Sequence, residues 1–128
     1  MILASRALAI LYSFLEYNCN KTAPFILPVN ICHTVHWCFI KAGIPVIFCD
    51  LEPTHLCIDL EKAENILRHT PCQGLLFNHT YGTDYYPEEK LHKIRASKGK
   101  LFIIDDRCLC VPNFNHLSFH AAIADLTI

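Results

Sequence analysis

Two common metal-binding motifs are absent from this sequence of 128 residues, although it contains eight cysteines and eight histidines. No Cys-x-x-Cys pair occurs, which excludes a zinc-ribbon pattern, and no His-Glu-x-x-His arrangement occurs. His33 and His36 share the face of a predicted helix, but no acid accompanies them. We therefore expect no metal site. Basic blocks are also absent and the net charge is −1, so no pattern indicates nucleic-acid binding.

Long apolar runs are absent as well, and none suffices to span a membrane. Arg6 followed by an apolar run imitates a signal peptide, but residues 16–18 are polar where a small-residue cleavage site would stand. The run has the apolar spacing of a helix, which is the better interpretation. Cys49 and Cys108 lie in or beside apolar runs, where a reduced cysteine behaves as a small hydrophobe. We expect a cytoplasmic protein with mostly reduced thiols and no membrane partner.

Hydrophobic residues, by contrast, are abundant and make up 52% of the chain. The length suits a single domain over residues 1–128. So high an apolar content indicates either a domain buried in a larger assembly or one part of a longer chain whose remainder covers it.

Helical spacing and short apolar runs alternate along the chain. Ser5 is a candidate N-cap for the first helix, Asp59 for the third, and Gly43 is a C-terminal stop for the second. Pro87 opens the fourth helix. The predicted helices cover residues 5–17, 30–42, 60–69 and the segment after 87, and the predicted strands cover 24–28, 44–50, 73–77, 100–106 and a last strand beginning within 121–128.

This alternation predicts a three-layer α/β/α domain with a mostly parallel sheet and right-handed crossovers. Ligands of such sheets collect beyond the carboxyl ends of the strands. The residues at those ends are Pro28 with Asn30, Asp50, Asn78 with His79, and Asp105 with Asp106.

Three segments, taken in order, resemble one enzyme family. They are LPVNICHTVHWCFIKAGIPVIFCDLEPTHLCID (27–59), LLFNHTYG (75–82) and LFIIDDRC (101–108). The set resembles the DegT/DnrJ/EryC1/StrS aminotransferases, which are pyridoxal-phosphate (PLP) enzymes of the aspartate-aminotransferase fold. The resemblance covers nearly the whole chain but only the front part of the family's large domain. It implies PLP as cofactor, a keto sugar nucleotide and an amino donor as substrates, and a homodimer.

The resemblance also implies roles for three residues. Asp106 matches the aspartate that pairs with the pyridine nitrogen of PLP and keeps it protonated. His79 matches a histidine near the ring and substrate, where it orients its neighbours. Ser5 stands where a helix N-terminus grips the cofactor phosphate. The same residues also fit plainer roles, in which Asp105 and Asp106 both start a solvated turn, a backbone group satisfies His79, and Ser5 is only an N-cap. Asp50 and Asp59 match family positions that look structural.

The chain departs from the family pattern at several polar positions. Ala4 replaces a glycine of the phosphate turn, and Asn30 replaces an aromatic residue. Arg107 replaces a small residue and must find room or compete for the carboxylate of Asp106. Leu109 stands where the family has a glutamine or histidine. The Schiff-base lysine of the family has no counterpart among the seven lysines, so we expect the chain not to transaminate by itself.

The resemblance leaves two interpretations of the chain open, and a third does not depend on it. The chain is either a piece of an aminotransferase or a degenerate binding module that keeps the fold without the chemistry. An unrelated flavodoxin-like domain ranks last, because the PVNICHT turn after the first strand has no glycine for a phosphate loop.

Overall fold

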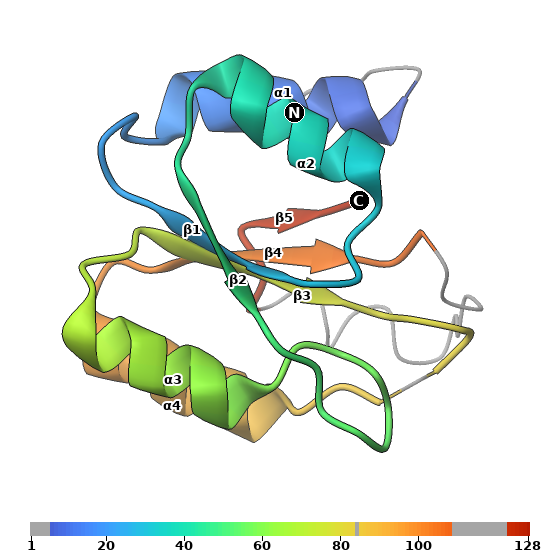
Figure 1. Cartoon of the computed structure of the whole chain (residues 1–128). Coiled ribbons are helices and arrows are strands. Elements are labelled where there is room, and N and C mark those ends of the chain that lie inside the picture. The colour runs from blue at the N-terminus through green and yellow to red at the C-terminus, as the bar shows by residue number, and fades with distance from the viewer. Residues whose placement is uncertain (1–5, 84, 109–122) are drawn as a thin grey trace.

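A five-stranded parallel sheet forms the centre of the protein, with helices on both of its faces (Figure 1). The computed structural model describes residues 6–83, 85–108 and 123–128. The strand order is β2-β1-β3-β4-β5, and every pair of neighbours is parallel. The elements are α1 (Ala7–Asn18), β1 (Phe25–Pro28), α2 (His33–Ala42), β2 (Val46–Cys49), α3 (Leu60–His69), β3 (Gly74–Asn78), α4 (Glu88–Lys98), β4 (Phe102–Asp106) and β5 (Leu126–Thr127).

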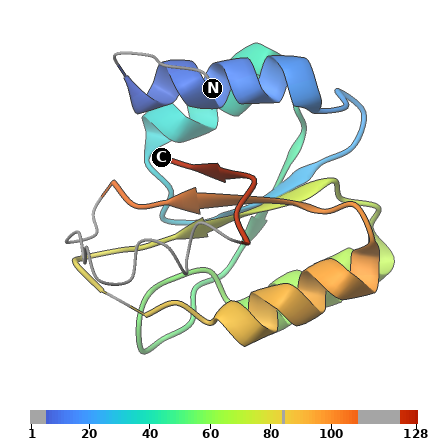
Figure 2. The ribbon, with the colours of Figure 1, turned by 180° about the vertical axis from the view of Figure 1, so that it is seen from behind.

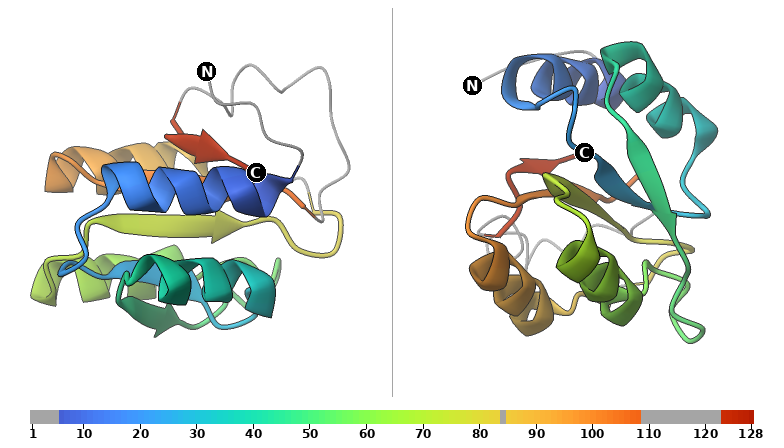
Figure 3. Two further views of the ribbon diagram at one scale, coloured as in Figure 1. Left: turned by 90° about the horizontal axis from the view of Figure 1, so that it is seen from above. Right: turned by 60° about the vertical axis from the view of Figure 1, so that its left-hand side comes forward.

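Two separate apolar cores lie on the two faces of the sheet. The views from behind and from above show the helices on either side of the sheet (Figures 2 and 3). Helices α1 and α2 cover one face, and α3 and α4 cover the other. Successive residues of a strand point to opposite faces, so Leu76 joins the core under α1 and α2, whereas Leu75 and Phe77 join the core over α3 and α4. The predicted three-layer architecture is therefore confirmed.

Local signals in the sequence account for most element boundaries. The Asp59 side chain accepts hydrogen bonds from the amides of Glu61 and Lys62, so it caps α3 as predicted. Gly43 ends α2 with a φ of 70°, a left-handed conformation that favours glycine. The predicted N-cap of α1 was wrong by one residue, because Arg6 occupies that position and offers no side-chain cap, and the helix begins at Ala7. Ser5 itself lies outside the described residues.

The strand predictions are confirmed, with β1, β3 and β4 lying in the interior of the sheet. Their continuous apolar runs suit strands that are buried on both faces. Because all the strands are parallel, the polar residues that follow each strand gather at one edge of the sheet. The fold thus assembles the candidate site.

Gly74 is required where β3 passes β1. It pairs with Phe25 in the parallel register, and a Cβ atom at position 74 would overlap three atoms of the buried Phe25 ring. The ring fills the space that a side chain at 74 would occupy.

We predict that Gly74→Ala lowers the free energy of unfolding by about 1–3 kcal/mol, because the added methyl overpacks the core. Urea unfolding followed by circular dichroism measures the change. The double variant Phe25→Leu/Gly74→Ala should be less destabilised than the sum of its two single variants. Strict additivity of the two changes would refute the steric explanation.

Candidate functional site

The two consecutive acids at the end of β4 belong to opposite faces of the sheet. Asp105 follows the alternation of Ile103 and faces the α3/α4 side, whereas Asp106 follows Ile104 and faces the α1/α2 side. Both are buried, with exposed fractions of 0% and 7%. The alternative that both acids begin a solvated turn is therefore wrong.

Asp105 is the centre of a buried polar cluster. One carboxylate oxygen, Oδ1, lies 2.8 Å from Nε2 of His79, and the other, Oδ2, accepts a 2.6 Å hydrogen bond from Nε of Arg107. The guanidinium of Arg107 lies over the Tyr86 ring, 5.7 Å from its centroid, and the His79 ring lies nearly parallel to the same ring. Burial, reinforced by the Asp105 carboxylate, raises the pKa of Tyr86. Arg107 thus finds room beside Asp105 and does not compete for Asp106.

Asp106 has a different environment. Its Oδ1 accepts a 3.1 Å hydrogen bond from the amide of Cys108, and its backbone carbonyl accepts a 2.9 Å bond from the amide of His79. Within the described ranges, no Lys, Arg or His forms an ion pair with this carboxylate. A buried carboxylate without a counter-charge is suited to a cationic partner such as a protonated pyridine nitrogen.

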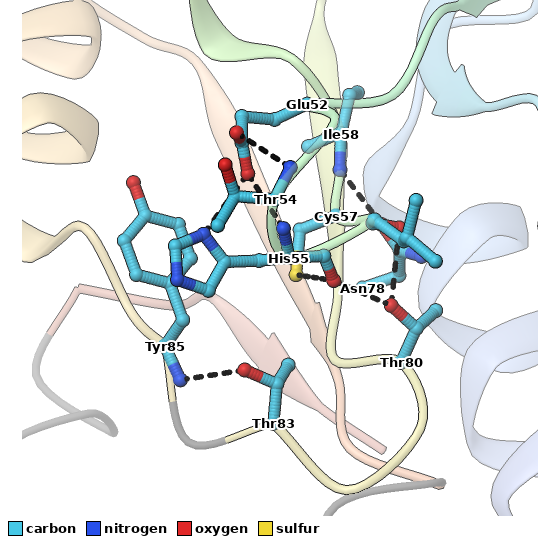
Figure 4. A network of polar contacts seen from close by, with 10 residues as sticks. Glu52, Thr54, His55, Cys57, Ile58, Asn78, Thr80, Thr83 and Tyr85 are labelled. Carbon is cyan, nitrogen blue, oxygen red and sulfur yellow. Dashed lines mark hydrogen bonds and ion pairs between the residues drawn. The ribbon is translucent and has the colours of Figure 1, made fainter.

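A second network ties the loops at the same edge together (Figure 4). Asn78 lies at the end of β3; its Oδ1 accepts from the amide of Ile58, and its Nδ2 donates to Oδ1 of Asn30. Nδ2 of Asn30 and the hydroxyl of Thr80 both donate to the carbonyl of Leu56, each at 3.0 Å. These bonds hold Leu56 at a φ of 57°, a conformation that leucine rarely adopts. The loop after β2 is thereby fixed against the ends of β1 and β3.

The outer part of that loop is stabilised by Glu52 (Figure 4). Hydrogen bonds from the amides of Thr54 and His55, and from the His55 ring, lower the pKa of Glu52 to about 2. The His55 ring stacks on Tyr85 with 3.8 Å between centroids. The loop between β2 and α3 is thus attached to the segment before α4.

Two thiols flank the same edge of the sheet and differ in acidity. Cys32 is exposed at the N-cap position of α2; its Sγ lies 3.1 Å from Oγ1 of Thr34, and this hydrogen bond with that of the Thr34 amide lowers the Cys32 pKa. Burial and the nearby Asp106 carboxylate raise the pKa of Cys108 to about 11. The seven cysteines of the described part of the chain are free thiols.

The structure brings most of the predicted strand-end residues together, with Asp50 as an exception. The exposed Asp50 carboxylate forms a 2.8 Å ion pair with Lys62 at the surface and contacts none of the residues described above. Asp50 pairs with Lys62 and Asp59 caps α3, so both have structural surroundings. Ala4, Ser5 and Leu109 lie outside the described residues, so the phosphate-anchoring role of Ser5 stays a prediction, as do the cofactor roles of His79 and Asp106.

Sequence reasoning missed the pairing of Arg107 with Asp105 and the roles of Thr80 and Tyr86. The first had a signal: residues two apart on a strand share a face, so Arg107 was placed to reach Asp105 rather than Asp106. The described residues contain no group of three or more His, Cys, Asp or Glu that could hold a metal ion. None of the helices in the described ranges has the length and apolar character needed to cross a bilayer.

Solved structures of PLP enzymes are similar to this chain. NtdA from Bacillus subtilis, solved with bound cofactor PMP, aligns with a TM-score of 0.77 and 26% identity over 94% of this chain and 26% of its own. The sugar aminotransferase CalS13 from Micromonospora echinospora aligns with a TM-score of 0.63 and 16% identity, covering 78% of this chain and 28% of its own. A PLP-bound C-S lyase from Staphylococcus hominis gives a TM-score of 0.67 and 18% identity, with 77% and 27% covered.

The chain thus has the fold of PLP-dependent transferases and spans about a quarter of the length of the structures it matches. No family model matches the sequence, and a search of the curated proteins gave no match.

We predict that iodoacetamide alkylates Cys32 before Cys108 at pH 7.5. Both thiols are exposed, but the lowered pKa of Cys32 gives it the larger thiolate fraction. A more acidic thiol is also a weaker nucleophile, which offsets part of this advantage. The alkylation of Cys32 should still be faster by roughly tenfold or more. Peptide mass spectrometry over time measures both rates, with Cys32→Ser to confirm the assignment. Equal rates would contradict the described environments.

Proposed function

We propose that this chain is the front part of the large domain of a PLP-dependent aminotransferase of the DegT/DnrJ/EryC1/StrS family. The complete enzyme would transfer an amino group from an amino acid to a keto sugar nucleotide and would act in the cytoplasm as a homodimer. The alignment with NtdA supports the proposal, since it extends over 94% of the chain. The observation that carries it is the environment of Asp106.

The burial and the unpaired charge of Asp106 fit the binding of PLP. Its carboxylate lies at the carboxyl end of an interior strand, is 7% exposed, and forms no ion pair within the described part of the chain. A protonated ring nitrogen would supply the missing cation, and the low dielectric of the site would strengthen the pair. When bound, PLP supplies an electron sink for the carbanion formed on an amino acid.

Two backbone amides fix the position of Asp106. The amide of His79 donates to the carbonyl of Asp106 and fixes the end of β4 against β3. The amide of Cys108 holds one carboxylate oxygen, so the carboxylate has a fixed orientation. Ser5 and the N-terminus of α1 would receive the phosphate, as the family resemblance implies.

The second candidate function is a degenerate binding module with the same fold. It is favoured by the lysines, which all lie on helices or beside them. Several are already engaged at the surface: Lys21 with Glu16, Lys62 with Asp50, and Lys90 with Glu61. Such a module would have lost the cofactor site, and without a Schiff-base lysine it would not form the covalent link.

We predict saturable PLP binding by the purified chain, weakened about 10–100-fold in Asp106→Asn through loss of one charge-assisted hydrogen bond. Absorbance titration measures the affinity. The control is Asp50→Asn, which removes an exposed acid at the end of the edge strand β2 and should leave binding unchanged. After borohydride reduction, intact mass should show no stoichiometric adduct.

Other outcomes separate the two candidates. A folded chain that binds no PLP would favour the degenerate module and refute the proposal. One adduct per chain at a single lysine would overturn the claim that this chain has no Schiff-base residue.

A further inference from the structure

The buried cluster around Asp105 contains nitrogen atoms without partners. Among the described residues, Nδ1 of His79 and Nη2 of Arg107 are buried and accept or donate no hydrogen bond. The His79 side chain is only 3% exposed, so bulk water does not satisfy its ring. Buried polar atoms of native proteins nearly always have partners, which makes these two exceptions informative.

The contacts of Asp105 determine which nitrogen of His79 carries the proton. Both oxygens are engaged, Oδ1 with His79 and Oδ2 with the guanidinium of Arg107, which is always charged. A carboxylate only accepts hydrogen bonds, and Arg107 already donates to its second oxygen. Nε2 of His79 must therefore be the protonated nitrogen. In the neutral imidazole, Nδ1 then keeps a free lone pair.

We propose that Asp105 and Arg107 are positioning residues that hold His79 as the Nε2–H tautomer and so create a hydrogen-bond acceptor at Nδ1. The group that such a nitrogen would bind is a hydroxyl or an amine, because an aldehyde or a carboxylate has no proton to donate. The identity of this ligand group rests on the proposed function. In an aminotransferase, the donor would come from the sugar or from the amine that is transferred.

The arrangement gives Arg107 a role that a small residue at this position could not have. The small residue of the family pattern could not reach Asp105, whereas Arg107 forms the ion pair and also lies over Tyr86. Tyr86 in turn packs against the His79 ring, so the imidazole is fixed in its plane as well as through Nε2. The ring can present Nδ1 in only a narrow range of directions.

The experiment is nitrogen NMR of the histidine rings in the 128-residue chain without any ligand. Protonated and unprotonated imidazole nitrogens have widely separated ¹⁵N shifts, so the tautomer is read directly. His79→Gln assigns the signals by removing them. We expect His79 to be a single Nε2–H tautomer in the unchanged chain. Arg107→Lys should retain it, since the cation persists beside Asp105.

Two variants should lose the single tautomer. Arg107→Gln removes the guanidinium that donates to Asp105 and holds its carboxylate in place, and the His79 shifts should move toward averaged values. Asp105→Asn places an amide donor opposite Nε2, so the proton should transfer to Nδ1. The matched control is Asp125→Asn, which breaks the other aspartate–arginine pair, Asp125 with Arg95, and should leave His79 unchanged. If Asp105→Asn does not fold, Arg107→Gln alone tests the proposal. It should fold, because the Arg107 side chain is partly exposed.

An Nδ1–H tautomer or an imidazolium in the unchanged chain would overturn the proposal, as would a tautomer indifferent to Arg107→Gln. Because the rings are read without ligand, failure of PLP to bind would refute the proposed function and leave this assignment standing.

Discussion

The complete burial of one carboxylate constrains everything at the carboxyl edge of this sheet. Asp105 is inaccessible to solvent and lies on an interior strand between β3 and β5. An unpaired charge in such a place is prohibitively unstable, and breaking a buried pair costs about 3–5 kcal/mol. Arg107 and His79 supply the pairing, and in doing so they fix the direction in which β4 leaves the sheet. Because successive residues of a strand point to opposite faces, Asp106 lies on the other face of the sheet.

The division between the two acids links the fold to the proposed chemistry. Asp105 is neutralised by its own chain and belongs to the structure. Asp106, one residue later, is buried with amide contacts but no ion pair in the described ranges, which is why we propose it as the partner of a cationic ligand. The Asn30–Asn78–Leu56 network fixes the neighbouring loops, so the edge of the sheet is ordered around both acids. Arg107 thus holds Asp105 and does not reach the face on which Asp106 lies.

Much of this architecture could be predicted from the sequence, because it follows from local rules. The buried strands are short apolar runs, Asp59 is a capping residue before an amphipathic helix, and Gly43 supplies a left-handed turn. The site was harder, since its contacts join segments far apart in the chain. The hydrogen bond of Asn30 to the Leu56 carbonyl depends on the path of a loop, and no spacing rule gives it. By sequence Asp50 is equivalent to the other strand-end acids, but in the structure it forms an ion pair with Lys62 at the surface.

The most direct test of this account compares Asp105→Asn with Asp106→Asn in urea unfolding of the chain without PLP. If Asp105 is the structural acid and Asp106 the acid kept for a ligand, Asp105→Asn lowers the free energy of unfolding by about 3 kcal/mol or more. Asp106→Asn should change it by less than about 1 kcal/mol, since it breaks no ion pair. Equal losses in the two variants, or a larger loss in Asp106→Asn, would contradict the division of roles between the two acids.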